Sequence, residues 1–120
     1  MMANKSEKLI EWPTVTINIL LYNRKKEILI VLDAIMHELD YPSNKLEIIV
    51  VNNASTDGSG ELVLAKYPNI KLINMRKNVG ISAWNEGFKV GRGNYFLVLD
   101  DDAYIKGGTL MNESIIESML

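Results

Sequence analysis

From Thr14 onward, short runs rich in Val, Ile and Leu alternate with longer segments of helical periodicity, and this alternation restricts the possible folds. The apolar runs are too short for helices and contain many β-branched residues, which is typical of strands. We predict strands at Val15–Tyr22, Glu47–Val51, Ile70–Asn74 and Tyr95–Leu99.

The segments between these strands have the spacing of amphipathic helices. We predict helices at about Lys25–Leu39, Gly60–Tyr67 and Ile81–Val90, and helical spacing returns at Leu110–Leu120. Strands separated by helices pair in parallel through right-handed crossovers. The predicted fold class is therefore α/β, an open, doubly wound and mainly parallel sheet with helices on both faces.

Composition excludes several classes of protein. A chain of 120 residues with 48% hydrophobic and 23% charged residues is expected to form one globular domain, here 14–120 after a lead-in at 1–13. A net charge of −2 gives no attraction to nucleic acid, and the absence of cysteine excludes thiolate metal sites. We find no transmembrane segment and no signal peptide, so we expect a cytoplasmic location, including the cytoplasmic face of a membrane.

Polar residues follow every predicted strand, in the loops at Tyr22–Arg24, Asn52–Gly58, Asn74–Asn78 and Asp100–Asp102. An open parallel sheet binds its ligands at the carboxyl ends of the strands, where the strand order reverses. The opposite edge carries ordinary turn residues. The sequence therefore predicts a binding site at the carboxyl edge of the sheet.

The run Asp100-Asp101-Asp102 is the sharpest feature of that edge. Three adjacent carboxylates repel one another unless a cation lies between them. Mg²⁺ and Mn²⁺ typically take one or two carboxylates together with waters and substrate phosphate oxygens. We predict that Asp100 and Asp102 face one side as metal ligands and that Asp101 turns to the rim. A solvated acidic turn without a metal is the alternative.

The loop after the second strand carries short polar side chains that can hold a base and a ribose. Asn52, which directly follows the strand, is the strongest ligand candidate there, whereas Asp57 could instead cap the next helix. Arg76 could meet a diphosphate or form a solvated basic turn. The nucleotide-binding candidates in these loops are Asn23, Asn52, Asn53, Ser55, Asp57, Arg76 and Asp101.

Other chemistries fit the sequence poorly. A haloacid-dehalogenase-like phosphatase needs its nucleophilic Asp at the end of the first strand, whereas the acidic run follows the fourth. A dinucleotide dehydrogenase needs a glycine-rich turn after the first strand, and no glycine is present there. The single histidine, His37, argues against histidine-based metal or nucleophile schemes.

Three stretches together resemble the nucleotide-binding half of a family 2 glycosyltransferase with the Rossmann-like GT-A fold. They are VTINILLYNR, EIIVVNNASTDGS and KNVGISAWNEGFKVGRGNYFLVLDDD, and they cover about Val15 to Asp102. The resemblance implies a UDP-, TDP- or GDP-linked sugar as donor, Mg²⁺ or Mn²⁺ as cofactor, and a glycan or lipid-linked sugar as acceptor. It also implies a role in cell-surface polysaccharide biosynthesis.

The resemblance assigns roles to individual residues. Tyr22 would border the nucleoside, and Asn52 occupies the position of an Asp that usually accepts a hydrogen bond from the base. Asp100 would lie near the ribose or a metal-bound water, and Asp102 would bind the metal directly. Residues that shape the donor loop and the facing helix would be Asn78, Gly80 and Asn85.

The catalytic base of this inverting family comes from an acceptor half downstream of the acidic run. We expect that base beyond Leu120, since Glu113 and Glu117 are unsuitable. The chain is thus predicted to be a donor-binding half, truncated after the acidic strand and inactive alone. A non-catalytic nucleotide- and metal-binding fragment is the open alternative. The apolar segment 115–120 predicts self-association through the exposed C-terminal surface.

Overall fold

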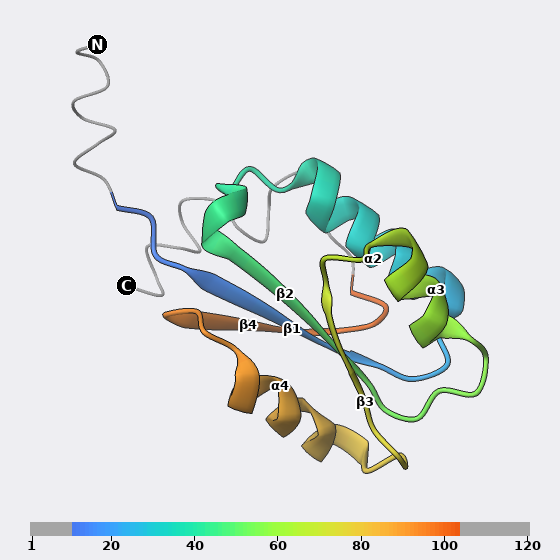
Figure 1. The fold of residues 1–120 in the computed structure, drawn as a ribbon. Coiled ribbons are helices and arrows are strands. Elements are labelled where there is room, and N and C mark those ends of the chain that lie inside the picture. Colours follow the sequence, from blue (N-terminus) through green and yellow to red (C-terminus); the bar gives the residue numbers. More distant parts are fainter. Residues whose placement is uncertain (1–10, 104–120) are drawn as a thin grey trace, which may run out of the picture.

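The computed structural model describes residues 11–103, which form a parallel sheet flanked by helices (Figure 1). The strands and helices follow one another in the predicted order. They are β1 (Val15–Leu21), α2 (Lys25–Glu38), the 3₁₀ turn η1 (Ser43–Lys45), β2 (Leu46–Asn52), α3 (Ser59–Lys66), β3 (Lys71–Asn74), the 3₁₀ turn η2 (Gly80–Ala83), α4 (Trp84–Val90) and β4 (Tyr95–Asp100).

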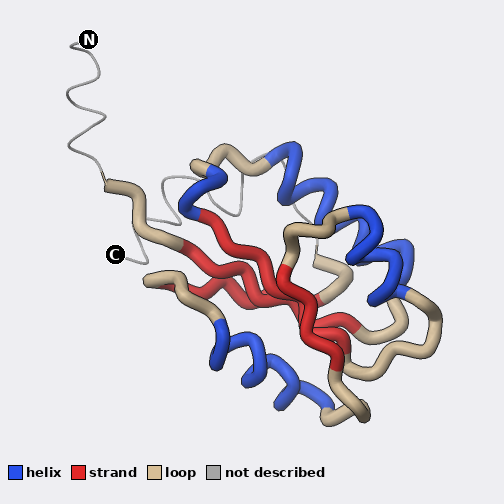
Figure 2. The backbone as a smooth tube through the Cα atoms, in the orientation of Figure 1, coloured by secondary structure: helices blue, strands red, loops and turns tan. Residues whose placement is uncertain are grey.

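The four strands lie in the order β3-β2-β1-β4 and pair in parallel throughout. In the register, Ile17 of β1 lies beside Ile48 of β2 and Leu97 of β4. Helices α2 and α3 cover one face of the sheet and α4 covers the other (Figure 2). The doubly wound α/β prediction is confirmed, and the winding direction reverses between β1 and β4. That reversal is where such folds form their ligand crevice.

Strand β1 is central and is buried on both faces. Its residues Val15, Ile17, Ile19 and Leu21 belong to the main core, which they form with the inner face of α2. The alternate residues Thr16 and Asn18 face the α4 side and are also buried. A strand covered on both faces reads as a nearly continuous apolar run, which explains why the sequence revealed it.

On the α4 side, glycines let the helix and the turn after it approach the sheet closely. A Cβ on Gly87 would lie 2.1 Å from Oδ1 of Asn18, and one on Gly93 would lie 2.6 Å from the backbone nitrogen of Thr16. The side chain of Asn18 also donates a hydrogen bond to the carbonyl of Trp84 at 3.1 Å. Asn18 and Gly87 therefore fix the distance between α4 and β1.

Glu47 connects several segments at the amino edge of the sheet, opposite the predicted site. Its carboxylate accepts hydrogen bonds from the hydroxyl of Thr16 at 2.6 Å and from the backbone N–H of Arg92 at 2.8 Å, and it pairs with Lys71 at 3.2 Å. Burial alone would raise the pKa of Glu47, but these hydrogen bonds and the charge of Lys71 hold it below its ordinary value. The charged form is therefore favoured by folding.

Glu47→Gln is expected to lower the free energy of unfolding by about 1–2 kcal/mol at neutral pH, because hydrogen bonds to a charged group are lost. A pKa that is depressed by folding means that the native state binds fewer protons than the unfolded state. The contribution of Glu47 is thus present above pH 4.5, its ordinary pKa, and is lost as the pH falls through the folded value. Urea unfolding of the wild type and of Glu47→Gln from pH 7 to pH 3 should show the two curves converging. Glu61→Gln, at an exposed glutamate, serves as control. If the difference in free energy of unfolding between wild type and Glu47→Gln does not shrink at low pH, this role of Glu47 is contradicted.

Several predicted boundaries differ from the structure. Asn52 is the last residue of β2 rather than the first residue after it, because it still pairs with Leu21 and Asn74. The helix predicted at 81–90 is divided into η2 and α4. Strand β4 was predicted to be covered on both faces, but it lies at the edge of the described sheet and Val98 is 41% exposed.

Two sequence predictions concern the ends of the chain. The helical segment at 110–120 and the self-association of its apolar end lie outside the described residues.

Within residues 11–103, no helix is both long and apolar enough to cross a bilayer.

Candidate functional site

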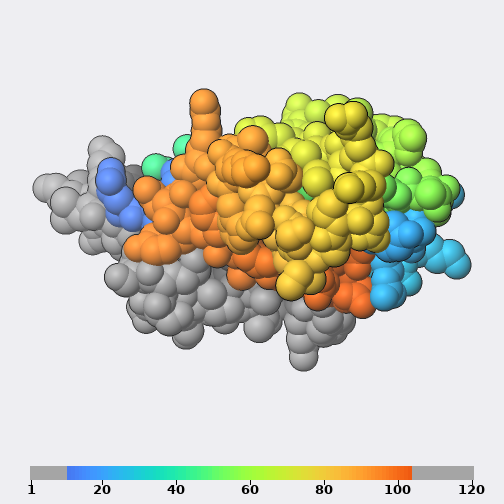
Figure 3. All heavy atoms as spheres, turned by 90° about the horizontal axis from the view of Figure 1, so that it is seen from below, coloured from blue at the N-terminus to red at the C-terminus, as the bar shows by residue number. Residues whose placement is uncertain are grey.

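Strand order predicts the ligand crevice between the turn after β1 and the end of β4. Figure 3 shows these two segments, coloured blue and dark orange, reaching the surface beside each other at one end of the molecule. The backbone N–H of Tyr22 donates a hydrogen bond to Oδ2 of Asp101 at 2.8 Å, which joins segments 79 positions apart. The structure therefore brings the acidic run to the β1 turn.

Asp101 is the buried member of the acidic run. We predicted it at the rim, and this prediction is wrong, since Asp101 is only 9% exposed whereas Asp100 and Asp102 are exposed. Leu99 and Asp101 are both buried, whereas Asp100, the last residue of β4, and Asp102, in the turn after it, are both exposed. The buried carboxylate has a structural role, because it holds the Tyr22 backbone.

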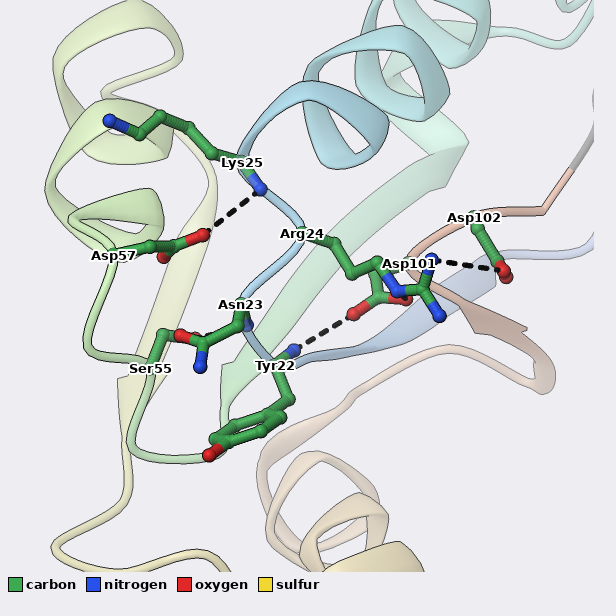
Figure 4. Close-up of polar contacts among 8 residues, drawn as sticks. All are labelled: Tyr22, Asn23, Arg24, Lys25, Ser55, Asp57, Asp101 and Asp102. Atoms are coloured by element: carbon green, nitrogen blue, oxygen red, sulfur yellow. Dashed lines mark hydrogen bonds and ion pairs between the residues drawn. The ribbon is translucent and has the colours of Figure 1, made fainter.

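Arg24 balances part of this negative charge. Its Nε lies 3.7 Å from Oδ1 of Asp101, and its Nη1 lies 3.8 Å from Oδ2 of Asp102 (Figure 4). Burial raises the pKa of Asp101, and the charges of Asp102 and Asp100 raise it further, while the Tyr22 N–H and Arg24 act in the opposite direction. Burial is the main cause of the net rise. Three carboxylates face one guanidinium in this cluster, so negative charge remains.

The exposed pair Asp100 and Asp102 fits a divalent ion that is shared with a phosphate ligand. No group of three or more His, Cys, Asp or Glu side chains within residues 11–103 is arranged to hold a metal ion by itself. Mg²⁺ needs only one or two carboxylates when waters and phosphate oxygens complete its shell. The hard oxygen donors and their uncompensated charge suit such an ion.

Asn52 does not point freely into the crevice. Its Nδ2 donates to Oδ1 of Asn74 at 2.9 Å, and its Oδ1 accepts from the backbone N–H of Ser55 at 3.1 Å. Gly60, at the start of α3, packs against this amide so closely that a Cβ there would lie 2.4 Å from Nδ2. In the structure the side chain of Asn52 therefore supports the loop after β2.

Asn53 links the loop after β2 to the loop after β3. It is 2% exposed, its Nδ2 donates to Oδ1 of Asn78 at 2.9 Å and to the carbonyl of Gly80 at 3.2 Å, and its Oδ1 accepts from the N–H of Val79 at 3.0 Å. Asn78 in turn accepts from the N–H of Gly80 at 2.8 Å. The structure thus brings together the three predicted residues Asn53, Asn78 and Gly80, whose hydrogen bonds connect the loop after β2 with the loop after β3.

Asp57 joins the amino ends of two helices. Its Oδ1 accepts from the N–H of Ser59 in the first turn of α3 at 2.9 Å, and its Oδ2 accepts from the N–H of Lys25 in the first turn of α2 at 3.2 Å. The hydrogen bonds to Ser59 are the main reason that the pKa of Asp57 lies below its ordinary value. Asp57 precedes the N-cap residue Gly58, and its carboxylate is engaged by the amino ends of both helices.

Every residue with a positive φ in the described range lies in these carboxyl-edge loops. They are Asn23, Ala54, Gly58 and Gly80, with φ values of 52°, 66°, 82° and 67°. A left-handed conformation at a residue such as Ala54 is unfavourable, by roughly 1–2 kcal/mol, and persists only when the surroundings impose it. Strain of this kind concentrates at functional sites.

The remaining predicted residues, Tyr22, Arg76 and Asn85, are exposed. The ring of Tyr22 is 43% exposed, and Arg76 is exposed in the loop after β3. Asn85 lines an open groove of about 610 Å³ with Met75, Val79 and other residues of η2 and α4. None of the residues lining that groove belongs to the acidic run.

Sequence reasoning missed Arg24 as a site residue. A basic residue directly after the first strand, at the predicted point of strand-order reversal and opposite an acidic run, was the signal that could have identified it. It also missed Thr56, whose backbone N–H contacts Asn23.

A family model and a curated relative match most of this chain. The family model Glycosyl transferase family 2 matches residues 16–112. A probable glycosyltransferase from Bacillus subtilis, YdaM, is 37% identical over 103 residues, which cover 80% of this chain and 24% of that protein.

Two solved structures show the same fold. The mannosyltransferase PcManGT from Pyrobaculum calidifontis, in complex with GDP-Man and Mn²⁺, aligns with a TM-score of 0.78 and 27% identity over 96% of this chain and 37% of its own. Residues 1–349 of TarS from S. aureus, in complex with UDP-GlcNAc, align with a TM-score of 0.73 and 28% identity over 81% of this chain and 29% of its own. The chain therefore spans 24% of YdaM, 37% of the PcManGT chain and 29% of the TarS 1–349 chain.

The family match spans residues 16–112, which include all four strands, except for Val15, and the loops after them. The chain belongs to glycosyl transferase family 2 and has the GT-A fold.

Proposed function

We propose that residues 14–120 are the donor-binding portion of an inverting glycosyltransferase and hold a nucleoside diphosphate sugar between β1 and β4. The observation that carries this proposal is the arrangement of the acidic run at the point of strand-order reversal. Asp101 is buried against the Tyr22 backbone, while Asp100 and Asp102 are exposed beside it. A buried anchor flanked by two exposed carboxylates is suited to presenting oxygen ligands in a fixed direction.

In this proposal Asp100 and Asp102 hold Mg²⁺ or Mn²⁺ together with the diphosphate, with Asp102 as the direct ligand and Asp100 nearer the ribose or a metal-bound water. The bound ion supplies Lewis-acid neutralisation of the charge that develops on the leaving diphosphate. Arg24, which already lies within 3.8 Å of Asp102, can place its guanidinium beside the same phosphate oxygens. The solved neighbour with GDP-Man and Mn²⁺ supports the use of a divalent metal at such a crevice.

The nucleoside would lie against the exposed ring of Tyr22, since an aromatic ring offers a stacking surface to any base. The side-chain amides of Asn52 and Asn53 are hydrogen-bonded to other protein residues. They would therefore shape the base pocket by supporting the loop after β2, without contacting the base. Arg76 and Asn85 would reach the donor from the loop after β3 and from α4. The base, whether uracil, thymine or guanine, and the sugar, which we propose to be a hexose, would be selected at these positions.

Transfer would be to a hydroxyl of a glycan or a lipid-linked sugar at the cytoplasmic face of a membrane. We propose that the base which deprotonates this hydroxyl comes from a part of the enzyme outside this chain. The short span of the chain relative to PcManGT and TarS supports this division.

Calorimetric titration of the chain with UDP, TDP and GDP tests the proposal. We expect one-site binding of at least one of these nucleotides in the presence of Mn²⁺, and loss of most of the affinity when a chelator is added. Because the diphosphate and the two carboxylates are all anionic, their contact without a cation is repulsive. If none of the three nucleotides binds with Mn²⁺ present, the donor-site proposal fails.

The same preparation distinguishes a donor-binding portion from a complete catalyst. Incubation with UDP-, TDP- and GDP-sugars and a panel of glycan acceptors should give nucleotide binding without product. Sugar transfer by the chain alone would contradict our proposal that the base lies elsewhere.

A further inference from the structure

The turn after β1 is held by side chains from two other loops, as Figure 4 shows. Three of its backbone N–H groups, those of Tyr22, Asn23 and Lys25, donate to side-chain oxygens. The acceptors are Asp101 Oδ2 at 2.8 Å, Ser55 Oγ at 3.0 Å and Asp57 Oδ2 at 3.2 Å, in that order. The conformation of the turn is thus imposed by its neighbours.

Asn23 completes this connection in the other direction. Its own Oδ1 accepts a hydrogen bond from the backbone N–H of Thr56 at 2.7 Å, while its N–H donates to Ser55. Two hydrogen bonds of opposite sense therefore join Asn23 to the loop after β2. Its φ of 52° is left-handed, a conformation that Asn tolerates better than other residues with a Cβ.

The neighbours of Asn23 are the two residues of this turn that face the crevice. Tyr22 has an exposed ring and a backbone held by Asp101, and Arg24 pairs with Asp101 and Asp102. Since both residues are bonded covalently to Asn23, a shift of Asn23 changes the direction of each. The amide of Asn23, in contrast, is bonded to the β2 loop rather than directed at the acidic run.

We propose that Asn23 is a positioning residue of the donor site, which locks the β1 turn to the β2 loop and thereby directs Tyr22 and Arg24 into the crevice. This inference rests on the proposed function. It replaces the sequence-based prediction that Asn23 contacts the nucleotide. If Asn23 acts by accepting the hydrogen bond from the Thr56 N–H, another side chain with an oxygen at the same position can replace it, provided that the backbone conformation is kept.

Two substitutions separate the acceptor from the backbone. Asn23→Gly keeps the left-handed φ accessible but removes the acceptor, whereas Asn23→Asp keeps an oxygen at the same place. We expect Asn23→Gly to weaken Mn²⁺-dependent binding of the best of UDP, TDP and GDP by about tenfold, and Asn23→Asp to stay within about threefold of wild type. Asn69→Gly, in the exposed turn before β3, is the matched control and should bind like wild type.

Two further measurements report on the mechanism. In ¹⁵N–¹H spectra without ligand, the amide proton of Thr56 should move upfield and exchange faster in Asn23→Gly, because it loses its acceptor. The melting temperature shows whether the variant is folded at the titration temperature. A purely structural role would lower the melting temperature and leave the affinity of the folded protein unchanged, and that result would overturn the inference.

Equal losses of affinity in Asn23→Asp and Asn23→Gly would also overturn it, because they would indicate that the amide N–H group contacts the ligand directly. A wild-type chain that binds none of the three nucleotides would overturn the proposed function and this inference with it. If the wild type binds a nucleotide and Asn23→Gly binds it with the same affinity, the inference about Asn23 is overturned and the proposed function stands.

Discussion

Replacement of Asp102 by asparagine is expected to weaken Mn²⁺-dependent binding of a nucleoside diphosphate by about 100-fold while leaving the fold intact. Asp102 is half exposed and its pairing with Arg24 at 3.8 Å is long, so its removal costs little stability. Asparagine keeps one oxygen but loses the charge that attracts a divalent ion between two anionic groups. The loss should therefore appear in the nucleotide titration with Mn²⁺ and not in urea unfolding.

Asp40→Asn provides the matched control, since Asp40 is an exposed aspartate beyond the end of α2 and away from the crevice. It should leave nucleotide binding unchanged. In the presence of chelator, wild type and Asp102→Asn should bind equally weakly, because the difference between them depends on the ion. Unchanged affinity of Asp102→Asn with Mn²⁺ would exclude Asp102 as a ligand.

Gly87→Ala is expected to lower the free energy of unfolding by about 3 kcal/mol, which is a large fraction of the stability of a small domain. The new Cβ would lie 2.1 Å from Oδ1 of Asn18. Asn18 is fully buried in the central strand and its Nδ2 is bonded to the Trp84 carbonyl, so it cannot swing away at low cost. Either α4 lifts from the sheet or Asn18 loses its hydrogen bond. Urea unfolding monitored by tryptophan fluorescence measures the change.

A double-mutant cycle tests the cause of this destabilisation. Asn18→Ala removes the atoms that collide with the new Cβ, so Asn18→Ala combined with Gly87→Ala should be more stable than the sum of the single changes by about 1–2 kcal/mol. Gly87→Ala with wild-type stability, or strictly additive effects, would show that Asn18 does not set the distance of α4.

The fold could be predicted from the sequence because its central strand is buried on both faces. Because both faces of β1 are buried, its sequence from Val15 to Leu21 is mostly apolar, with only Thr16 and Asn18 polar. The same reasoning failed for β4, where an apolar sequence accompanies partial exposure of Val98 at the sheet edge. Apolar composition does not by itself distinguish an edge strand from a central one.

The gathering of polar loops at one edge could also be predicted, because the carboxyl ends of parallel strands lie at the same edge of the sheet. The role of each of the polar residues in those loops could not be predicted from the sequence. Asn53, Asp57 and Asn23 are all short polar residues with ligand-like chemistry, and each makes a hydrogen bond to a segment distant in sequence. Their partners lie 25 to 33 positions away in sequence, so no local pattern reveals them.

The roles within the acidic run could not be predicted from strand alternation. Strand β4 ends at Asp100, and in the turn after it Asp101 is buried while Asp102, like Asp100, is exposed. The exposed pair is therefore the one available to a ligand. Asp101 has become an internal anchor whose removal should act through Tyr22 rather than through the metal.

The position of the metal tests the donor-site proposal most directly. Crystals of the chain grown with Mn²⁺ and whichever of UDP, TDP or GDP binds best should show an anomalous peak from manganese. We predict that peak between Asp102 and the diphosphate, with the base beside Tyr22. A nucleotide bound elsewhere, or manganese with no contact to Asp100 or Asp102, would contradict the proposed donor site.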